Sequence, residues 1–205
     1  MSANPILFNT DMVCAILANR KTVTRRVVEP QLPGNVIKIC EVDPLGYMAL
    51  QTSDQLLGGW QNRKCRYAPG DILYVRETWT TLVGRYLYKA DQKPDMQNPG
   101  KWRPSIHMPR EAARIFLRVT DVRVERLRDI DYEGCKAEGI WDDYKTTGER
   151  YHDALARKAY PIAFAGLWDS TIKPADRALY DWAANPWVWV IKFERVSREE
   201  AMNNA

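Results

Sequence analysis

The stretch ANRKTVTRR, residues 18–26, places a lysine, three arginines and two threonines where the residue pattern changes from helical to extended. Before it, NTDMVCAILAN (9–19) opens on capping residues and then spaces its apolar side chains as an amphipathic helix does. After the helix, KTVTRRVV (21–28) is rich in β-branched residues, which favour a strand. We therefore predict a helix-to-strand joint in this stretch.

Extended runs follow along the chain, separated by turn signals such as DPLG (43–46). These predicted strands are NVIKICEV (35–42), GYMALQT (46–52), APGDILYVRETW (68–79), the runs 115–120 and 122–127, and NPWVWVIKFERV (185–196). The last run alternates large apolar side chains with valine and lysine, so we expect its tryptophans to be core residues of a closing strand.

Two later stretches have helical patterns. DIDYEGCKAEGI (129–140) offers an aspartate cap, a short helix and Gly139 as its stop. HDALARKAYPIAFAGLWD (152–169) is predicted to be a helical region interrupted at Pro161, because proline costs a helix interior about 3 kcal/mol.

The strands are short and show no βαβ rhythm, which predicts an α+β fold: a small mixed β-barrel with peripheral short helices. The polar stretches 89–106 and 140–152 are expected to be inserted loops. We take residues 1–205 as one domain, with insertions at 80–106 and 140–185.

Composition narrows the class of protein. The chain has 205 residues, 45% of them hydrophobic and 27% charged, which indicates a globular domain. Its formal charge of +4 suits a phosphate-bearing partner but is far below that of a DNA-coating protein. No apolar run approaches ~18 residues, so no membrane span is predicted. Four scattered cysteines without a CxxC pair or leader peptide predict reduced thiols and a cytoplasmic protein. His107 and His152 lack metal-ligand spacing, so neither a metal nor another cofactor is expected.

The order of these motifs resembles an ASCH domain of the PUA-like superfamily, of the phage or prophage type with longer insertions. The resemblance covers most of the chain and rests on ANRKTVTRR, PGDILYVRETW, IDYEGCKAEGI and NPWVWVIKFERV. It implies a β-barrel whose cleft faces RNA or a modified nucleoside. Some small members resemble amidohydrolases that remove an acyl group from the exocyclic amine of cytosine nucleosides, and another is similar to a ribonuclease.

The family's amidohydrolases use a lysine, a threonine three residues later and a glutamate in the later short helix. The resemblance places these roles on Lys21, Thr24 and Glu138. Amide hydrolysis needs a nucleophile and a base, which Thr24 and Lys21 would supply, with Glu138 moving protons or activating water. Lys21 acts as a base only if its pKa falls from ~10.4 toward ~7–8, which burial and the neighbouring arginines favour.

Strict strand alternation would point Lys21 and Thr24 to opposite faces, unless Lys21 belongs to the turn. The pattern leaves this point open. A structural role is the alternative for both residues: a solvated cation at the helix end and a strand-forming threonine. Thr22 is a rival hydroxyl and a ligand-binding candidate, whose ordinary role would be a backbone hydrogen bond in the turn.

Further ligand-binding candidates surround this stretch. Cations and aromatic side chains together would hold phosphate and stack a base, and these candidates are Arg20, Arg25, Arg26, Arg76, Tyr74 and Trp79. Glu77 is either an acid that faces the ligand or the ion-pair partner of a nearby cation.

Three functions follow from these candidates. The first is an amidohydrolase acting on acylated cytosine nucleosides without a metal. The second is a module that binds RNA or a modified base without turnover, which a basic groove without a closed pocket would favour. The third is a ribonuclease that cuts single-stranded RNA. Lys21, Thr24 and Glu138 meeting in one cleft would favour the first.

Overall fold

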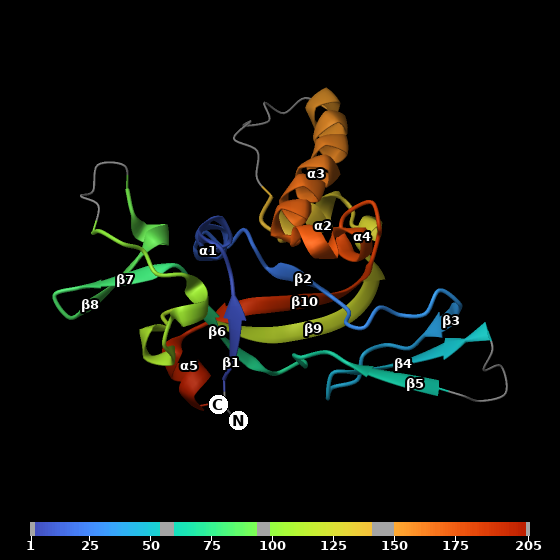
Figure 1. The fold of residues 1–205 in the computed structure, drawn as a ribbon, viewed down its shortest axis with the longest axis horizontal. Helices are drawn as coiled ribbons and strands as arrows, with labels where there is room; N and C mark the ends of the chain where they lie inside the picture. The colour runs from blue at the N-terminus through green and yellow to red at the C-terminus, as the bar shows by residue number, and fades with distance from the viewer. Residues whose placement is uncertain (1–2, 54–59, 94–98, 141–149, 204–205) are drawn as a thin grey trace.

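A central sheet of five strands organises the molecule (Figure 1). The computed structural model describes residues 3–53, 60–93, 99–140 and 150–203. The strand order is β1-β6-β9-β10-β2, and β1 lies parallel to β6 while the other neighbours are antiparallel. These strands are β1 (Asn4–Leu7), β2 (Val23–Val27), β6 (Ile72–Arg76), β9 (Phe116–Arg126) and β10 (Trp187–Val196).

Two smaller sheets project from opposite ends of the central sheet (Figure 1). One contains β3 (Val36–Ile39), β4 (Tyr47–Thr52) and β5 (Trp60–Lys64), and the other is the hairpin of β7 (Trp79–Leu82) and β8 (Arg85–Tyr88). The helices are α1 (Thr10–Leu17), α2 (Tyr132–Ala137), α3 (Arg150–Thr171), α4 (Arg177–Tyr180) and α5 (Arg198–Asn203). Short 3₁₀ turns are η2 (Lys89–Asp91), η3 (Ser105–His107), η4 (Arg110–Ala112), η5 (Leu127–Asp129) and η6 (Pro174–Asp176).

The α+β class is confirmed, but no closed barrel is found in the described part of the chain. The central sheet ends in β1 on one edge and β2 on the other, and no ladder joins these edges. The chain runs from β1 through α1 to β2, while the strands that could have closed the sheet pair locally with their sequence neighbours. An open seam is therefore left between β1 and β2.

Two predictions of element breaks are wrong. The runs 115–120 and 122–127 form one strand, β9, because its pairing with β10 continues across a bulge. Lys192 pairs with Asp121 and Phe193 with Val119, which leaves Thr120 as the extra residue on β9. The helix α3 continues through Pro161. Its side chains Phe164 and Trp168 are buried, and such burial outweighs the local cost of a proline.

The predicted insertions, 80–106 and 140–185, carry regular structure where they are described. The range 80–106 includes β8, η2 and part of η3, and 140–185 includes α3, η6 and α4. Residues 94–98 and 141–149, within the predicted loops 89–106 and 140–152, lie outside the described residues.

Both faces of β10 are buried along its uninterrupted apolar run, residues 188–191, whereas Lys192 and Glu194 further along are exposed. On one face Trp189, Ile191 and Phe193 pack with α1, β4, β6 and β9. On the other face Val188 and Val190 pack against α2 and α3, which Figure 1 shows grouped beside the sheet. A third cluster joins β7, η4 and α5 around the buried Trp79.

Candidate active site at the open seam

The joint between α1 and β2 places Lys21 in the short link before the strand and Thr24 within the strand. Asn9 caps α1 by accepting a hydrogen bond from the Met12 amide at 2.9 Å. At the other end, the amides of Arg20 and Lys21 both donate to the Ala15 carbonyl, at 2.8 and 3.1 Å. Lys21 therefore belongs to the helix end, so strand alternation does not separate it from Thr24.

The C-terminal end of α2 holds this joint in position. Asp131 caps the start of α2 by accepting from the Gly134 amide at 2.7 Å, as its sequence predicts. At its other end the Thr22 amide donates to the Ala137 carbonyl at 2.8 Å, and Lys21 Nζ donates to the Glu138 carbonyl at 2.9 Å. Two otherwise unpaired helix carbonyls are thus satisfied by the joint.

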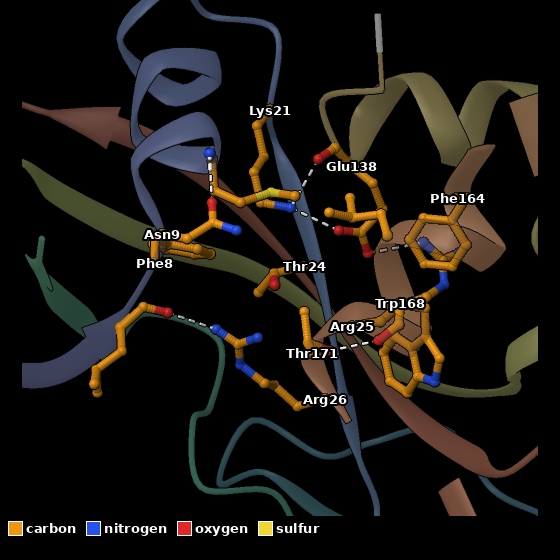
Figure 2. A pocket seen from close by; sticks show the side chains of 13 residues that line it. Phe8, Asn9, Lys21, Thr24, Arg25, Arg26, Glu138, Phe164, Trp168 and Thr171 are labelled. Atoms are coloured by element: carbon orange, nitrogen blue, oxygen red, sulfur yellow. Dashed lines mark hydrogen bonds and ion pairs between the residues drawn. The ribbon is translucent and has the colours of Figure 1, made fainter. Parts of the chain in front are cut away.

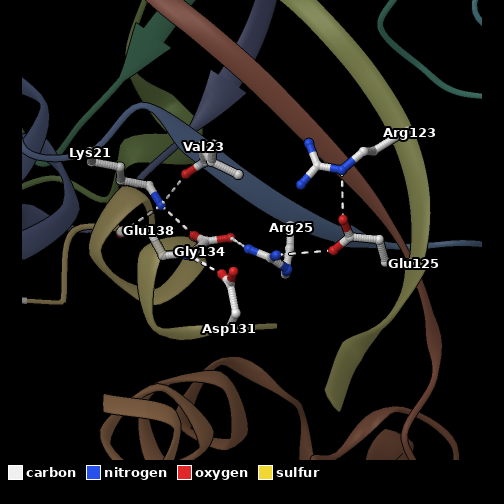
Figure 3. A network of polar contacts seen from close by, with 8 residues as sticks. All are labelled: Lys21, Val23, Arg25, Arg123, Glu125, Asp131, Gly134 and Glu138. Atoms are coloured by element: carbon white, nitrogen blue, oxygen red, sulfur yellow. Dashed lines mark hydrogen bonds and ion pairs between the residues drawn. The ribbon is translucent and has the colours of Figure 1, made fainter. Parts of the chain in front are cut away.

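Glu138 lies between two buried cations (Figure 3). Its Oε2 is 2.6 Å from Lys21 Nζ, and its Oε1 is 3.2 Å from an Arg25 nitrogen. Arg25 also pairs with Glu125 at 3.1 Å, and Glu125 pairs with Arg123 at 2.6 Å. The three innermost side chains are almost wholly buried, so their charges interact in a medium of low polarity.

Lys21 donates three hydrogen bonds, which uses every proton of an ammonium group. Its Nζ donates to the carboxylate Oε2 and the main-chain carbonyl of Glu138, and also to the Val23 carbonyl at 2.8 Å. Burial lowers the pKa of Lys21 below its ordinary value, and Glu138 opposes this effect while Arg26 and Arg25 add to it. The site therefore holds a lysine with a lowered pKa in short contact with a buried carboxylate.

A pocket of about 230 Å³ opens over this pair, at the end of the seam where β1 meets α1 (Figure 2). Lys21, Thr24 and Glu138 all line it. Thr24 is buried, and its hydroxyl has no hydrogen-bond partner among the described residues. The pocket therefore brings together a hydroxyl available to a ligand and a buried lysine–carboxylate pair.

Arg25 and Arg26 also line this pocket, so two of the predicted cations reach it. The Arg26 guanidinium donates to the Leu7 carbonyl at 2.9 Å across the seam. The Phe8 ring centre lies 5.4 Å from the Arg26 guanidinium carbon and 5.7 Å from Lys21 Nζ, within cation–π range.

The other six predicted ligand-binding residues do not line this pocket. Arg20 donates to the Gly139 carbonyl at 3.5 Å, and Thr22 lines a different hollow, whose lining mixes carboxylates and cations. The remaining four belong to the β6–β7 end of the molecule and are Tyr74, Arg76, Glu77 and Trp79.

Those four side chains have structural contacts. Trp79 is buried and Tyr74 packs against its cluster, while Arg76 donates to the Met108 carbonyl at 2.9 Å. Glu77 forms a bidentate ion pair with Arg114, at 2.8 and 3.0 Å. Burial raises the pKa of Glu77, and Arg114 opposes that shift. The rim that was expected to stack a base is therefore not assembled from these four residues.

The sequence interpretation missed the wall that α3 gives to the pocket. Phe164, Leu167, Trp168 and Thr171 line it from one face of this helix. Arg25 stacks on Phe164 at 5.9 Å, and the Trp168 indole donates to the Tyr180 carbonyl at 2.7 Å. Their three- and four-residue spacing indicates a shared helix face, but spacing alone does not say what that face covers.

The fold and site define a class: an α+β protein with a buried Lys–Glu–Arg network that borders a small pocket, where the edge strands β1 and β2 of an open sheet face each other. Comparison with protein-family models, curated proteins and solved structures gives no match. In the described ranges, no group of three or more histidine, cysteine, aspartate or glutamate side chains is arranged to hold a metal ion. Within the same ranges, no helix is long and apolar enough to cross a bilayer.

Proposed function

We propose that the protein is an amidohydrolase that removes an acyl group from the exocyclic amine of cytosine nucleosides. One observation carries the proposal: Lys21, Thr24 and Glu138, from a helix end, a strand and a second helix end, line one small pocket. Buried ionisable groups beside a hydroxyl are what an activated nucleophile needs. The resemblance of the KTVT motif to ASCH amidohydrolases supports the same three roles.

In this mechanism Thr24 Oγ attacks the acyl carbonyl carbon. A proton moves from Lys21 to Glu138 across the 2.6 Å contact, which leaves an amine able to accept the Thr24 proton. The carbon–nitrogen bond then breaks, and Lys21 returns the proton to the leaving exocyclic amine. Water hydrolyses the resulting threonine ester and releases the carboxylic acid.

The cations around the pocket have a role in this chemistry as well. Arg25 and Arg26 line the pocket together with Lys21, and Glu138 is the carboxylate among the lining residues. This excess of positive charge stabilises the oxyanion that develops on the acyl oxygen. With about 230 Å³, the pocket is smaller than the ~300–1,000 Å³ of typical ligand pockets, which suits an acylated base better than a whole nucleotide.

The test measures hydrolysis of cytidines that carry acetyl, propionyl or benzoyl groups on the exocyclic amine, by mass spectrometry. Thr24→Val keeps the β-branched shape in β2 and removes the hydroxyl, so we expect kcat/KM to fall by at least ~10²-fold. Thr24→Ser should retain measurable activity because it keeps a hydroxyl at the same place.

Thr22→Val is the matched control, because it removes the rival hydroxyl two residues away, outside the pocket. It should hydrolyse the substrate like the parent protein. Equal rates for the parent and Thr24→Val would sink the proposal. Tight binding of single-stranded RNA without acyl release would favour a binding module instead, and shortened RNA on a gel would favour a ribonuclease.

A further inference from the structure

A second and larger pocket lies along the same open seam. It measures about 510 Å³ and, like the first pocket, is lined by residues of both β1 and β2. Its buried lining side chains are Ile6, Cys65, Tyr67, Trp189 and Ile191. The Tyr67 hydroxyl donates to the Pro5 carbonyl at 2.8 Å, which ties the segment after β5 to β1 and fixes this wall.

The rim of this second pocket is cationic. Arg26, Lys64 and Arg66 line it, and Glu29 is the carboxylate among its lining residues. All three cations are exposed, and in the described part of the chain none of them forms an ion pair with a carboxylate. Lys64 stacks on Tyr47 at 4.8 Å and Arg66 on Tyr67 at 5.6 Å, so both charges are held at the rim.

Arg26 connects the two pockets, because it lines both of them together with Leu7. One Arg26 N–H group bonds to the Leu7 carbonyl, and no other hydrogen bond engages this guanidinium among the described residues. A guanidinium has five N–H donors in a planar fork that matches the oxygens of a phosphate. Arg26 can therefore bind a phosphate that lies between the pockets.

We infer that the second pocket binds the phosphate-bearing part of a ligand whose base occupies the first pocket. The inference rests on the proposed function for the identity of that base. A ligand that extends from the small pocket past Arg26 enters a cavity about twice as large, with an aromatic floor and unneutralised cations. Cationic rims with aromatic floors are typical of sites for phosphate-linked nucleotides. The preferred substrate is then a nucleotide or a nucleic acid strand rather than a free nucleoside.

The experiment measures binding by calorimetry, so that it does not depend on turnover. The probes are cytidine, cytidine 5′-monophosphate and a short oligocytidylate. We expect the parent protein to bind the two phosphate-bearing probes at least ~10-fold more tightly than cytidine. The Lys64→Gln/Arg66→Gln variant should lose most of this difference and bind cytidine like the parent.

A matched control removes the same charges elsewhere. Arg85 and Lys89 are exposed, lie in and beside β8, and line neither pocket of the seam. Arg85→Gln/Lys89→Gln should therefore keep the preference for phosphate. Equal loss in both double variants, equal affinity of the parent protein for all three probes, or no binding of any probe would overturn the inference.

The three probes also distinguish a nucleotide from a nucleic acid strand as the source of the phosphate, and the binding and hydrolysis measurements together distinguish the second-pocket proposal from the amidohydrolase proposal. If the oligocytidylate binds no more tightly than cytidine 5′-monophosphate, the ligand is a nucleotide. If the oligocytidylate binds more tightly and added salt weakens its binding, the ligand is a nucleic acid strand. Phosphate-dependent binding without acyl hydrolysis would support the second pocket and overturn the amidohydrolase. Hydrolysis of acylated cytidine without any phosphate preference would do the reverse.

Discussion

At the scale of single residues, the site depends on one carboxylate that serves two buried cations. Glu138 contacts both Lys21 and Arg25, and the side chains of all three are at most 5% exposed. Removing one partner of a buried ion pair leaves an uncompensated charge in a medium that cannot solvate it. Glu138 therefore stabilises the fold as well as serving the proposed chemistry.

We predict that Glu138→Gln lowers the free energy of unfolding by about 3–5 kcal/mol, measured by urea denaturation. The control is Glu125→Gln, which also removes a carboxylate from Arg25 but at a side chain that is 23% exposed. It should cost less than about 1 kcal/mol, because solvent screens the pair and Arg25 keeps Glu138. Equal costs for the two variants would contradict the central role of Glu138.

At the scale of elements, the site is formed where the ends of α1 and α2 meet the start of β2. Gly139 ends α2 with a φ of +93°, a conformation that favours glycine. A Cβ at this position would lie 2.9 Å from the Ala15 Cβ and 3.1 Å from the Lys21 Cβ. Glycine thus permits the close approach that places Lys21 against the carboxylate of the preceding residue, Glu138.

We predict that Gly139→Ala destabilises the protein by more than Gly70→Ala does. Gly70 has a similar φ of +91° but open space around the position of a Cβ, so its substitution should cost only the backbone strain, about 1–2 kcal/mol. Gly139→Ala adds the clash with α1 and should also reduce acyl hydrolysis by displacing Lys21. Thermal unfolding of both variants measures the difference, and similar losses of stability would refute the packing argument.

At the scale of the whole molecule, the central sheet joins two cores that lie on its opposite faces. β10 contributes to both, with Trp189 and Ile191 on one face and Val188 and Val190 on the other. The β7–β8 hairpin differs, because its tip exposes Leu82 and Val83. Opening β10 therefore requires disruption of both cores, whereas the hairpin tip can open locally.

We predict that amide hydrogen exchange reflects this arrangement. The amides of Val190 and Ile191 should exchange only through global unfolding, because β10 lies between two strands and is covered by a core on each face. Amides at the Leu82–Arg85 pairing should exchange at least ~100-fold faster. Mass spectrometry of peptic fragments measures both regions, and comparable protection would show that the hairpin unfolds only with the sheet.

Local residue preferences predicted the elements that set up the site. The capped helix before Lys21, the aspartate-capped α2, the glycine stop at Gly139 and the alternating strand β10 all appear where the sequence places them. These features depend on neighbours within a few residues, so a linear pattern contains them. The merger of two predicted strands into β9 and the continuation of α3 through Pro161 depend on partners distant in sequence, which such a pattern lacks.

The sequence by itself determined the chemistry available at the joint, a lysine, hydroxyls and arginines, and the type of most elements around it. Only the tertiary structure decided that Lys21 lies before the strand and meets Thr24 and Glu138 at one pocket. It also decided that Tyr74, Arg76, Glu77 and Trp79 lie elsewhere. It also decided that the sheet stays open, which leaves two adjoining pockets between β1 and β2. The physical reason is that hydrogen-bonded ladders and buried ion pairs form between segments more than a hundred residues apart.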